Sequence, residues 1–150
     1  MWLTSRISYG VRALINLALM YEKNQPVTIK EIAREEGISS LFLEQIFNCL
    51  KRKGLVKSVR GPKGGYALVK NPSDINIYQI LEALEGRKVS HRCFAHKEKG
   101  QVCKRAAVCA SREVWDDVDK QVKVTLEGYS LEHLATRTKE ISPDVPGRLM

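Results

Sequence analysis

Apolar and polar positions recur along the first part of the chain with the spacing of helices. Residues 5–22 carry apolar side chains three or four positions apart, which predicts an amphipathic helix with one buried face. Thr28 and Glu31 form a capping-box pattern that starts a second, short helix. Gly37 follows the last apolar position of that helix, and we expect it to end the helix in the left-handed conformation.

A third amphipathic helix follows after a short turn. Ser39 or Ser40 is expected to cap its start, and Gly54 closes it. The stripe that faces inward consists of Leu43, Ile46, Phe47 and Leu50. The opposite face presents Leu41, Glu44, Gln45, Asn48, Lys51 and Arg52. The second and third helices together indicate a helix-turn-helix, whose second helix enters the DNA major groove, although an ordinary helical hairpin gives the same pattern.

Two short runs of alternating residues come next, Val56–Arg60 and Tyr66–Val69, separated by the turn sequence GPKGG. They predict a β-hairpin directly after the third helix, and a helix-turn-helix followed by such a hairpin is a winged helix. Arg60, Pro62 and Lys63 make the tip basic, and its glycines let the backbone approach a phosphate or a narrow minor groove. Because the tip adjoins a basic helix, the pattern favours DNA contact over a merely solvated loop.

The second half of the chain contains three further helical patterns. Asn76 is placed to cap a helix that completes the core and ends at Gly86. Residues 111–128 form a longer helix whose apolar stripe consists of Val114, Trp115, Val118, Val122, Thr125 and Leu126. No further globule remains to cover this stripe, so it packs either on a second chain, as a dimerisation helix, or back on the first domain. Ser130 is expected to cap a last, short helix.

The positive charge of the chain indicates what kind of partner it binds. The chain has a formal net charge of +8. Residues 51–70 contain no Asp or Glu, and their basic residues are Lys51, Arg52, Lys53, Lys57, Arg60, Lys63 and Lys70. Such a patch indicates an acidic partner, most often nucleic acid. Since the sequence shows neither a signal peptide nor an apolar run of spanning length, we expect a cytoplasmic protein that does not contact membranes.

Three of the four cysteines lie close together in a polar segment: Cys93, Cys103 and Cys109. No two are spaced as C-x-x-C, which argues against a zinc ribbon. In a reducing compartment, grouped thiols indicate a metal centre or a redox switch, and zinc, an iron–sulfur cluster and a thiol switch all fit. His91 and His96 are either further ligands or solvated loop residues. Cys49, on the third helix, is expected to be a packed or free thiol.

Three stretches carry a resemblance to a known family. They are LTSRISYGVRALINLAL near the start, ISSLFLEQIFNCLKRKGLVKSVRGPKGGYALVK through the third helix and the hairpin, and the three-cysteine segment before the long helix. From residue 1 to about 135 the chain resembles the IscR- and NsrR-type iron–sulfur transcription regulators, the Rrf-two family. The resemblance implies a homodimeric winged-helix repressor or activator that binds a palindromic DNA site and holds a two-iron or four-iron cluster.

The resemblance also assigns cluster ligands, between the dimer helix and the DNA-binding domain. The cysteines that it implies are Cys93, Cys103 and Cys109. Relatives take the fourth ligand from a His three residues after the last Cys, or from an acidic residue of the partner chain, and these positions are Arg112 and Ser8 here. The candidates are therefore His96, His91, Ser8 or a small exogenous ligand. An open coordination position would make the iron reactive, which implies redox or nitric oxide sensing.

For DNA, the resemblance implies contacts from the third helix and the wing. The helix start and the base-reading face match the family at Ser39, Ser40, Glu44 and Gln45. A Gln suits adenine, and a Glu accepts from cytosine N4 while repelling phosphates and unmatched acceptors at other sites. Arg60, with Gly61, matches the wing residue that enters the minor groove. Phosphate contacts are expected from Lys51, Arg52, Lys57 and Lys63.

We therefore expect a mainly α fold with a small β-wing: a winged helix-turn-helix domain plus a long C-terminal dimerisation helix. Its four parts are a DNA-binding domain at 1–90, a cysteine-rich cluster-binding loop at 91–110, a dimerisation helix region at 111–138 and a flexible tail at 139–150. Two alternatives stay open, a cluster-free regulator that uses its cysteines as a thiol redox switch and a protein-interaction module. No enzyme is expected, because the sequence has no Ser-His-Asp set, no paired carboxylates in a cleft pattern and no phosphate-cradling loop before a helix.

Overall fold

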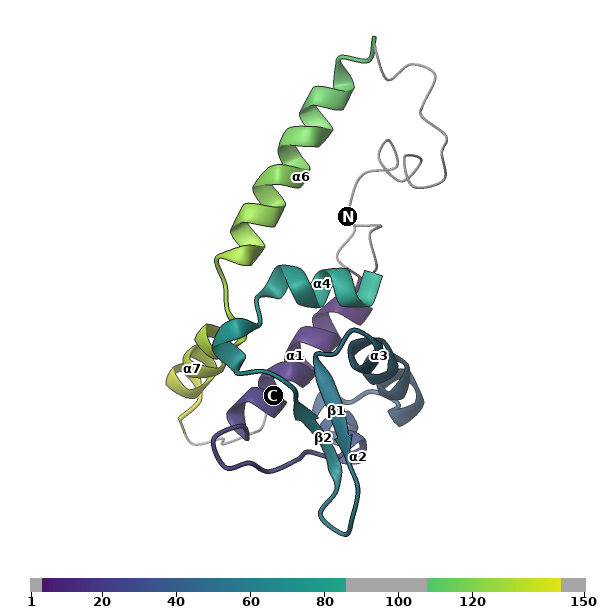
Figure 1. Ribbon diagram of the computed structural model, residues 1–150, viewed down its shortest axis with the longest axis vertical. Helices are drawn as coiled ribbons and strands as arrows, with labels where there is room; N and C mark the ends of the chain where they lie inside the picture. Colours follow the sequence, from purple (N-terminus) through teal and green to yellow (C-terminus); the bar gives the residue numbers. More distant parts are fainter. Residues whose placement is uncertain (1–3, 86–107, 144–150) are drawn as a thin grey trace.

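The computed structural model describes residues 4–85 and 108–143, whose arrangement is shown in Figure 1. In chain order the elements are α1 (Ser5–Leu19), α2 (Ile29–Glu36), α3 (Ser40–Arg52), β1 (Val56–Val59), β2 (Gly65–Leu68), the 3-10 turn η1 (Pro72–Asp74), α4 (Ile77–Glu85), α6 (Ser111–Glu127) and α7 (Leu131–Ile141). The predicted fold class, mainly α with a small antiparallel wing, is confirmed. Among the described residues, no helix is both long and apolar enough to cross a membrane.

The first helix is shorter than the span 5–22 that the apolar spacing predicts. It ends at Leu19, and the chain then turns through Asn24, whose φ of 49° is left-handed. Pro26 follows, and a proline has no N–H with which to continue a helical ladder. Tyr21, which lies within the predicted span, is therefore outside the helix and is 38% exposed.

The turn of the helix-turn-helix is built from the predicted local signals. The Glu31 N–H donates to Thr28 Oγ1 at 3.2 Å, and the Thr28 N–H donates to Glu31 Oε2 at 2.8 Å, which completes the capping box. The Thr28 N–H bond to Oε2, and after it a second bond that Thr28 Oγ1 donates to the same oxygen at 2.8 Å, hold the pKa of Glu31 below its ordinary value. Gly37 ends α2 with a φ of 66°, which residues with a Cβ rarely adopt. The chain direction between α2 and α3 is thus fixed locally.

The core is built around α1, against which α3, α4 and α7 pack (Figure 1). Ser39, one of the two predicted candidates, caps α3 by accepting from the Phe42 N–H at 3.1 Å. Asn76 caps α4 by accepting from the Gln79 N–H at 2.9 Å, whereas Gly86, its expected end, lies outside the described residues. The inward stripe of α3 is fully buried, as predicted: Leu43, Ile46, Phe47 and Leu50. This burial fixes α3 with its other face towards solvent.

The predicted wing is present and is tied to the helix-turn-helix. β1 and β2 are antiparallel, with Val59 opposite Gly65. Val27, just before α2, donates its N–H to the Tyr66 carbonyl at 3.0 Å and accepts from the Tyr66 N–H at 2.8 Å. Gly65 has a φ of 149°, and a Cβ there would meet the Val27 backbone, so this close approach requires glycine. The wing therefore keeps a fixed position relative to α2 and α3.

Helix α6 extends away from the rest of the described chain, with its N-terminal end farthest out (Figure 1). None of its residues is buried. The residues that follow α6 in sequence are hydrogen-bonded to the start of α4. The Ile77 N–H donates to the Tyr129 carbonyl at 3.0 Å, and the Leu131 N–H donates to the Ile75 carbonyl at 2.7 Å. We call this pair of hydrogen bonds the clasp. After it, α7 packs against α1 and η1, so the described chain returns to the core.

Candidate DNA interface and cluster-binding residues

One solvent-facing side of α3 carries a ridge of side chains suited to reading bases. Leu41, Glu44, Gln45 and Asn48 are all exposed. Their spacing of three, one and three residues places them on one face of the helix, opposite the buried stripe. Glu44 and Gln45 are predicted base-reading residues, and the structure brings them together with two side chains that had no assigned role. We call these four residues the reading ridge.

Beside the C-terminal half of α3 lies a shallow depression with a cationic rim. Its lining residues are Arg6, Gln45, Asn48, Cys49, Lys51 and Arg52. Arg6 Nη2 donates to Cys49 Sγ at 2.7 Å, and Arg52 Nη2 donates to the same sulfur at 3.2 Å. Lys51 Nζ donates to Ser58 Oγ at 2.9 Å and so links α3 to the wing. The predicted phosphate contacts Lys51 and Arg52 thus gain a neighbour, Arg6, from α1.

The other flank of the reading ridge is also hollowed. A second depression is lined by Thr28, Ile29, Lys30, Ser40, Glu44, Asn48, Gly65 and Tyr66. It contains one cation, Lys30, at the start of α2. Ser40, predicted to contact DNA, lies here beside Glu44. Since both depressions share Asn48, the reading ridge stands between two hollows.

The wing tip presents the other predicted DNA residues. Arg60, Gly61 and Lys63 are exposed in the loop between β1 and β2. Gly61 has a φ of 119°, and its carbonyl accepts from the Gly64 N–H at 2.9 Å, which closes the turn. Behind the tip, the rings of Phe47 in α3 and Tyr66 in β2 pack with centroids 4.7 Å apart. The wing and the reading ridge therefore face solvent as one rigid unit.

An ion pair fixes the end of α2 on α1. Arg12 Nη2 lies 2.6 Å from Glu36 Oε2, and the Glu36 side chain is 0% exposed while that of Arg12 is 39% exposed. Burial raises the pKa of the Glu36 carboxyl, and the attraction of Arg12 opposes this rise. The guanidinium of Arg12 also lies over the Tyr9 ring, 5.7 Å from its centroid. This contact holds the helix-turn-helix to the core helix.

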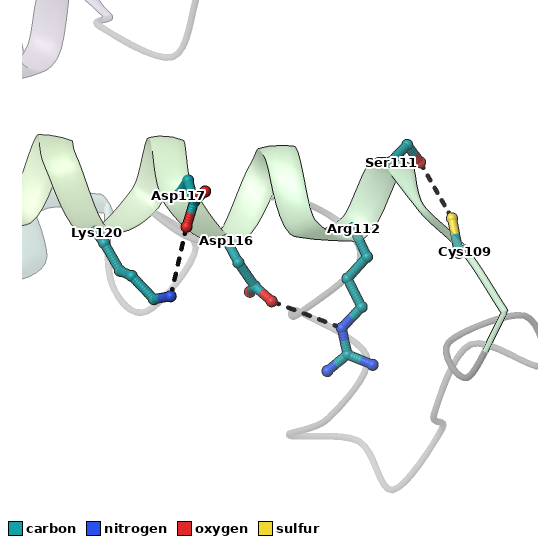
Figure 2. Close-up of polar contacts among 6 residues, drawn as sticks. All are labelled: Cys109, Ser111, Arg112, Asp116, Asp117 and Lys120. Atoms are coloured by element: carbon teal, nitrogen blue, oxygen red, sulfur yellow. Dashed lines mark hydrogen bonds and ion pairs between the residues drawn. The ribbon is translucent and has the colours of Figure 1, made fainter.

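The predicted cluster ligands are only partly within the described residues. Cys109 is half-buried and lies directly before α6, with its Sγ 3.1 Å from Ser111 Oγ (Figure 2). Arg112, at the position where relatives have a His, is paired with Asp116 at 3.9 Å (Figure 2). Ser8 is exposed on α1. The remaining predicted ligands fall outside the described residues: His91, Cys93, His96 and Cys103.

This arrangement of ridge, wing and outer helix was compared with known proteins. Residues 3–137 match the family model of Rrf2, described as an iron-dependent transcriptional regulator. The chain belongs to the Rrf2 family. Protein rrf2 of Nitratidesulfovibrio vulgaris is 36% identical over 134 residues, which make up 89% of this chain and 87% of that protein. The resemblance to the Rrf-two family, drawn from the sequence, is confirmed.

Two solved structures of Rrf2-type regulators share the fold. CymR (YrzC), the global cysteine regulator of B. subtilis, has a TM-score of 0.74 at 32% identity, over 90% of this chain and 96% of that one. IscR of T. potens has a TM-score of 0.75 at 31% identity, over 93% of this chain and 90% of that one. The chain is accordingly a DNA-binding transcription regulator of the Rrf2 type. Its relatives are regulators and not enzymes.

The donor chemistry of this Rrf2 protein fits an iron–sulfur cluster. Cysteine thiolates are the usual ligands of such clusters, and histidine replaces some of them in certain types. At Cys109, the peptide N–H groups of the first turn of α6 favour a negatively charged ligand. Residues 4–85 and 108–143 contain no group of three Cys, His, Asp or Glu side chains that could hold a metal.

Sequence reasoning missed Arg6 and Lys30, which lie beside the reading ridge. Arg6 belongs to the first turns of α1, far from α3 in sequence, and its contact with Cys49 exists only once the core has packed. No local pattern predicts such a neighbour. Lys30 was visible as an exposed charge at the start of α2, and its place beside the ridge follows only from the geometry of the turn.

Proposed function

We propose that this Rrf2 protein is a homodimeric regulator that binds a palindromic DNA site under the control of an iron–sulfur cluster. The reading ridge of α3, exposed between two hollows beside a basic wing, is the observation that carries the DNA part. The two α3 helices of a dimer enter successive major grooves, and the two wings reach the flanking minor grooves with Arg60 and Gly61. A cytoplasmic location is part of this proposal.

Each predicted DNA residue has a defined task in this arrangement. Glu44 and Gln45 read base edges, with Ser39 and Ser40 at the helix start beside them. Phosphates are bound by Lys51, Arg52 and Lys63, which supply most of the affinity and make it fall as the salt concentration rises. These tasks are supported by exposure, since all but the half-buried Ser40 lie on the exposed surface.

We propose that α6 forms the dimer interface. The outer part of its predicted apolar stripe is exposed to solvent, Val114 at 57%, Trp115 at 38% and Val118 at 41%, whereas Val122 and Leu126 are half-buried. Exposed apolar side chains grouped on one face mark an interaction surface. In a two-fold dimer the same surface of each chain meets its copy, so two α6 helices would bury both stripes.

The proposed cluster ligands are Cys93, Cys103 and Cys109, with His91, His96 or Ser8 as the fourth. Support comes from the iron-dependence in the family description and from the similarity to IscR of T. potens. A bound cluster would supply a group that oxygen or nitric oxide can alter. Cys109 lies two residues before α6, and α6 leads to the clasp. A rearrangement of residues 91–110 would therefore be passed along α6 to the winged helix-turn-helix domain. A coupling of about 1–3 kcal/mol changes DNA affinity about 5- to 150-fold.

A second candidate is a cluster-free regulator in which the same cysteines form a thiol switch. The observation in its favour is the similarity to CymR, named the global cysteine regulator of B. subtilis, over 90% of this chain. In this case the iron-free protein binds DNA, and oxidation of the thiols changes the affinity.

Purification without oxygen separates these functions. Iron and acid-labile sulfide are measured, with Mössbauer spectra, on the parent and on Cys93→Ala, Cys103→Ala and Cys109→Ala, with Cys49→Ala as the matched control. We expect iron in the parent and in Cys49→Ala, and its loss from the other three. An iron-free parent that still binds duplex DNA supports the thiol switch.

DNA binding is measured on the same samples by fluorescence anisotropy against salt concentration. We expect the parent to bind DNA with an affinity that falls as the salt concentration rises, and we expect Arg60→Ala to bind more weakly than the parent. Unchanged affinity in that variant would remove the wing from the interface. Absence of salt-dependent binding to any duplex would contradict the DNA function and leave a protein-interaction module.

A further inference from the structure

The reading ridge of α3 contains one apolar side chain in water. Leu41 is 68% exposed, whereas the other exposed large apolar side chains of residues 4–85 are between 36% and 48% exposed. It lies in the first turn of α3, one residue after Ser40. The opposite face of the same helix provides the core with four fully buried side chains, so the amphipathic pattern of α3 does not require a leucine at position 41.

The position of Leu41 places it where a base pair would lie. It precedes Glu44 and Gln45 by three and four residues, so the three side chains share one face of the helix. The N-terminal residues of a recognition helix are those that reach base edges in the major groove. Cations stand on both flanks of this face, Lys30 on one side and Arg6, Lys51 and Arg52 on the other. Leu41 is thus the apolar member of a surface otherwise suited to DNA.

We propose that Leu41 reads thymine by packing against its 5-methyl group. In the major groove each base pair displays hydrogen-bond donors and acceptors, and thymine alone among the four bases adds an apolar methyl. A leucine side chain forms no hydrogen bonds, so the favourable contact that it can make with a base edge is packing against that methyl. This inference rests on the proposed DNA function. It adds a thymine preference next to the positions read by Glu44 and Gln45.

The contact has a defined size and symmetry. Packing one methyl group out of water strengthens binding about 4-fold for each half-site, and about 15-fold for a dimer that uses both half-sites. Glu44 at the adjacent position repels phosphates and unmatched acceptors, and Leu41 adds selection by a contact that only one base can supply. The preference is therefore expected at one thymine in each half of a palindromic site.

Replacing thymine with deoxyuridine tests the contact, because this change removes only the methyl. A duplex site is first selected from random DNA with the full-length parent, in both iron-loaded and iron-free form. Each symmetric pair of thymines in that site is then replaced in turn. Dissociation constants are measured for the parent, Leu41→Ala, Leu41→Met and the control Gln45→Ala.

We expect one thymine pair at which deoxyuridine weakens binding by the parent about 15-fold. At that pair the loss on methyl removal is much smaller in Leu41→Ala, whose side chain is shorter, whereas Leu41→Met and Gln45→Ala keep the full loss. Leu41→Ala leaves an exposed helix site with a strong helix former, and its circular dichroism and melting temperature are compared with those of the parent. An equal loss in the parent and in Leu41→Ala overturns the methyl contact, although DNA binding itself persists. If the parent selects no duplex site and shows no salt-dependent binding to DNA, the proposed DNA function fails, and this inference fails with it. The two failures are thus distinguished by whether the parent binds DNA at all.

Discussion

Cys49 illustrates how one side chain acquires partners that its own helix does not supply. Its sulfur accepts hydrogen bonds from Arg52, in the same helix, and from Arg6, in α1. Lys51 lines the same depression. Three cations grouped beside the reading ridge suit a phosphate oxygen, whose contacts position a protein on DNA without reading its sequence.

Arg6→Ala is therefore expected to weaken DNA binding to a similar degree for all sequences. The slope of the logarithm of affinity against the logarithm of salt concentration should fall in magnitude by about 1, as expected when one phosphate contact is lost. Anisotropy titrations at several salt concentrations, with a selected and a scrambled duplex, measure both quantities. The control is Arg137→Ala, on the exposed side of α7 away from α3. A loss confined to the selected duplex would assign Arg6 to base reading instead.

At the scale of elements, the buried contact between Glu36 of α2 and Arg12 of α1 makes the stability of the fold depend on pH. The Glu36 carboxyl has a pKa raised by burial above its ordinary value of 4.5. It therefore binds its proton more readily in the folded chain than in the unfolded chain. Its contribution to the free energy of unfolding is largest at low pH and declines as the pH rises through the raised pKa.

Glu36→Gln should remove this decline. The variant cannot titrate at position 36, so its free energy of unfolding should fall less than that of the parent as the pH rises from 4.5 towards neutrality. Arg12, 39% exposed and stacked on Tyr9, stays solvated in the variant. Urea unfolding at several pH values measures the effect, with the exposed Glu22→Gln as control. Parallel pH profiles for parent and Glu36→Gln would contradict a raised pKa.

The elements also show what the sequence determines by itself. The capping box of α2, the left-handed Gly37 and the Ser39 cap were predictable, because each joins groups only a few residues apart. The end of α1 and the bond between Val27 and the wing were not, because they arise when distant segments meet. For the candidate site, the face of α3 followed from its 3.6-residue period, whereas Arg6 required the packed core. The cysteine ligands stay a prediction.

At the scale of the whole molecule, α6 contacts α4, with Lys123 over the Tyr78 ring, and its outer turns extend away from the core (Figure 1). A charge in the middle of its stripe should therefore disturb assembly and leave the fold intact. Val118→Glu is expected to shift the protein from dimer to monomer at micromolar concentration, because a buried, unpaired carboxylate is strongly unfavourable. Affinity for a palindromic duplex should fall with it, since each half-site is then bound singly.

The matched control is Val124→Glu, which is 66% exposed on the same helix but outside the stripe. Sedimentation velocity gives the oligomeric state, and circular dichroism checks that the helices persist. Equal behaviour of the two variants would show that α6 does not dimerise through this face.

The clasp between Tyr129–Leu131 and Ile75–Ile77 is a position at which segments of two related regulators could be joined. Helix α7, which follows the clasp in the chain, completes the packing of the winged helix-turn-helix domain on α1 and η1. The outer turns of α6 contribute no buried residue to this domain. Under the proposed function, we expect changes at the outer end to alter which signal is received without altering which DNA sequence is recognised. Evolution can vary the two properties separately, and a hybrid regulator joined at the clasp should inherit its target from one parent and its stimulus from the other.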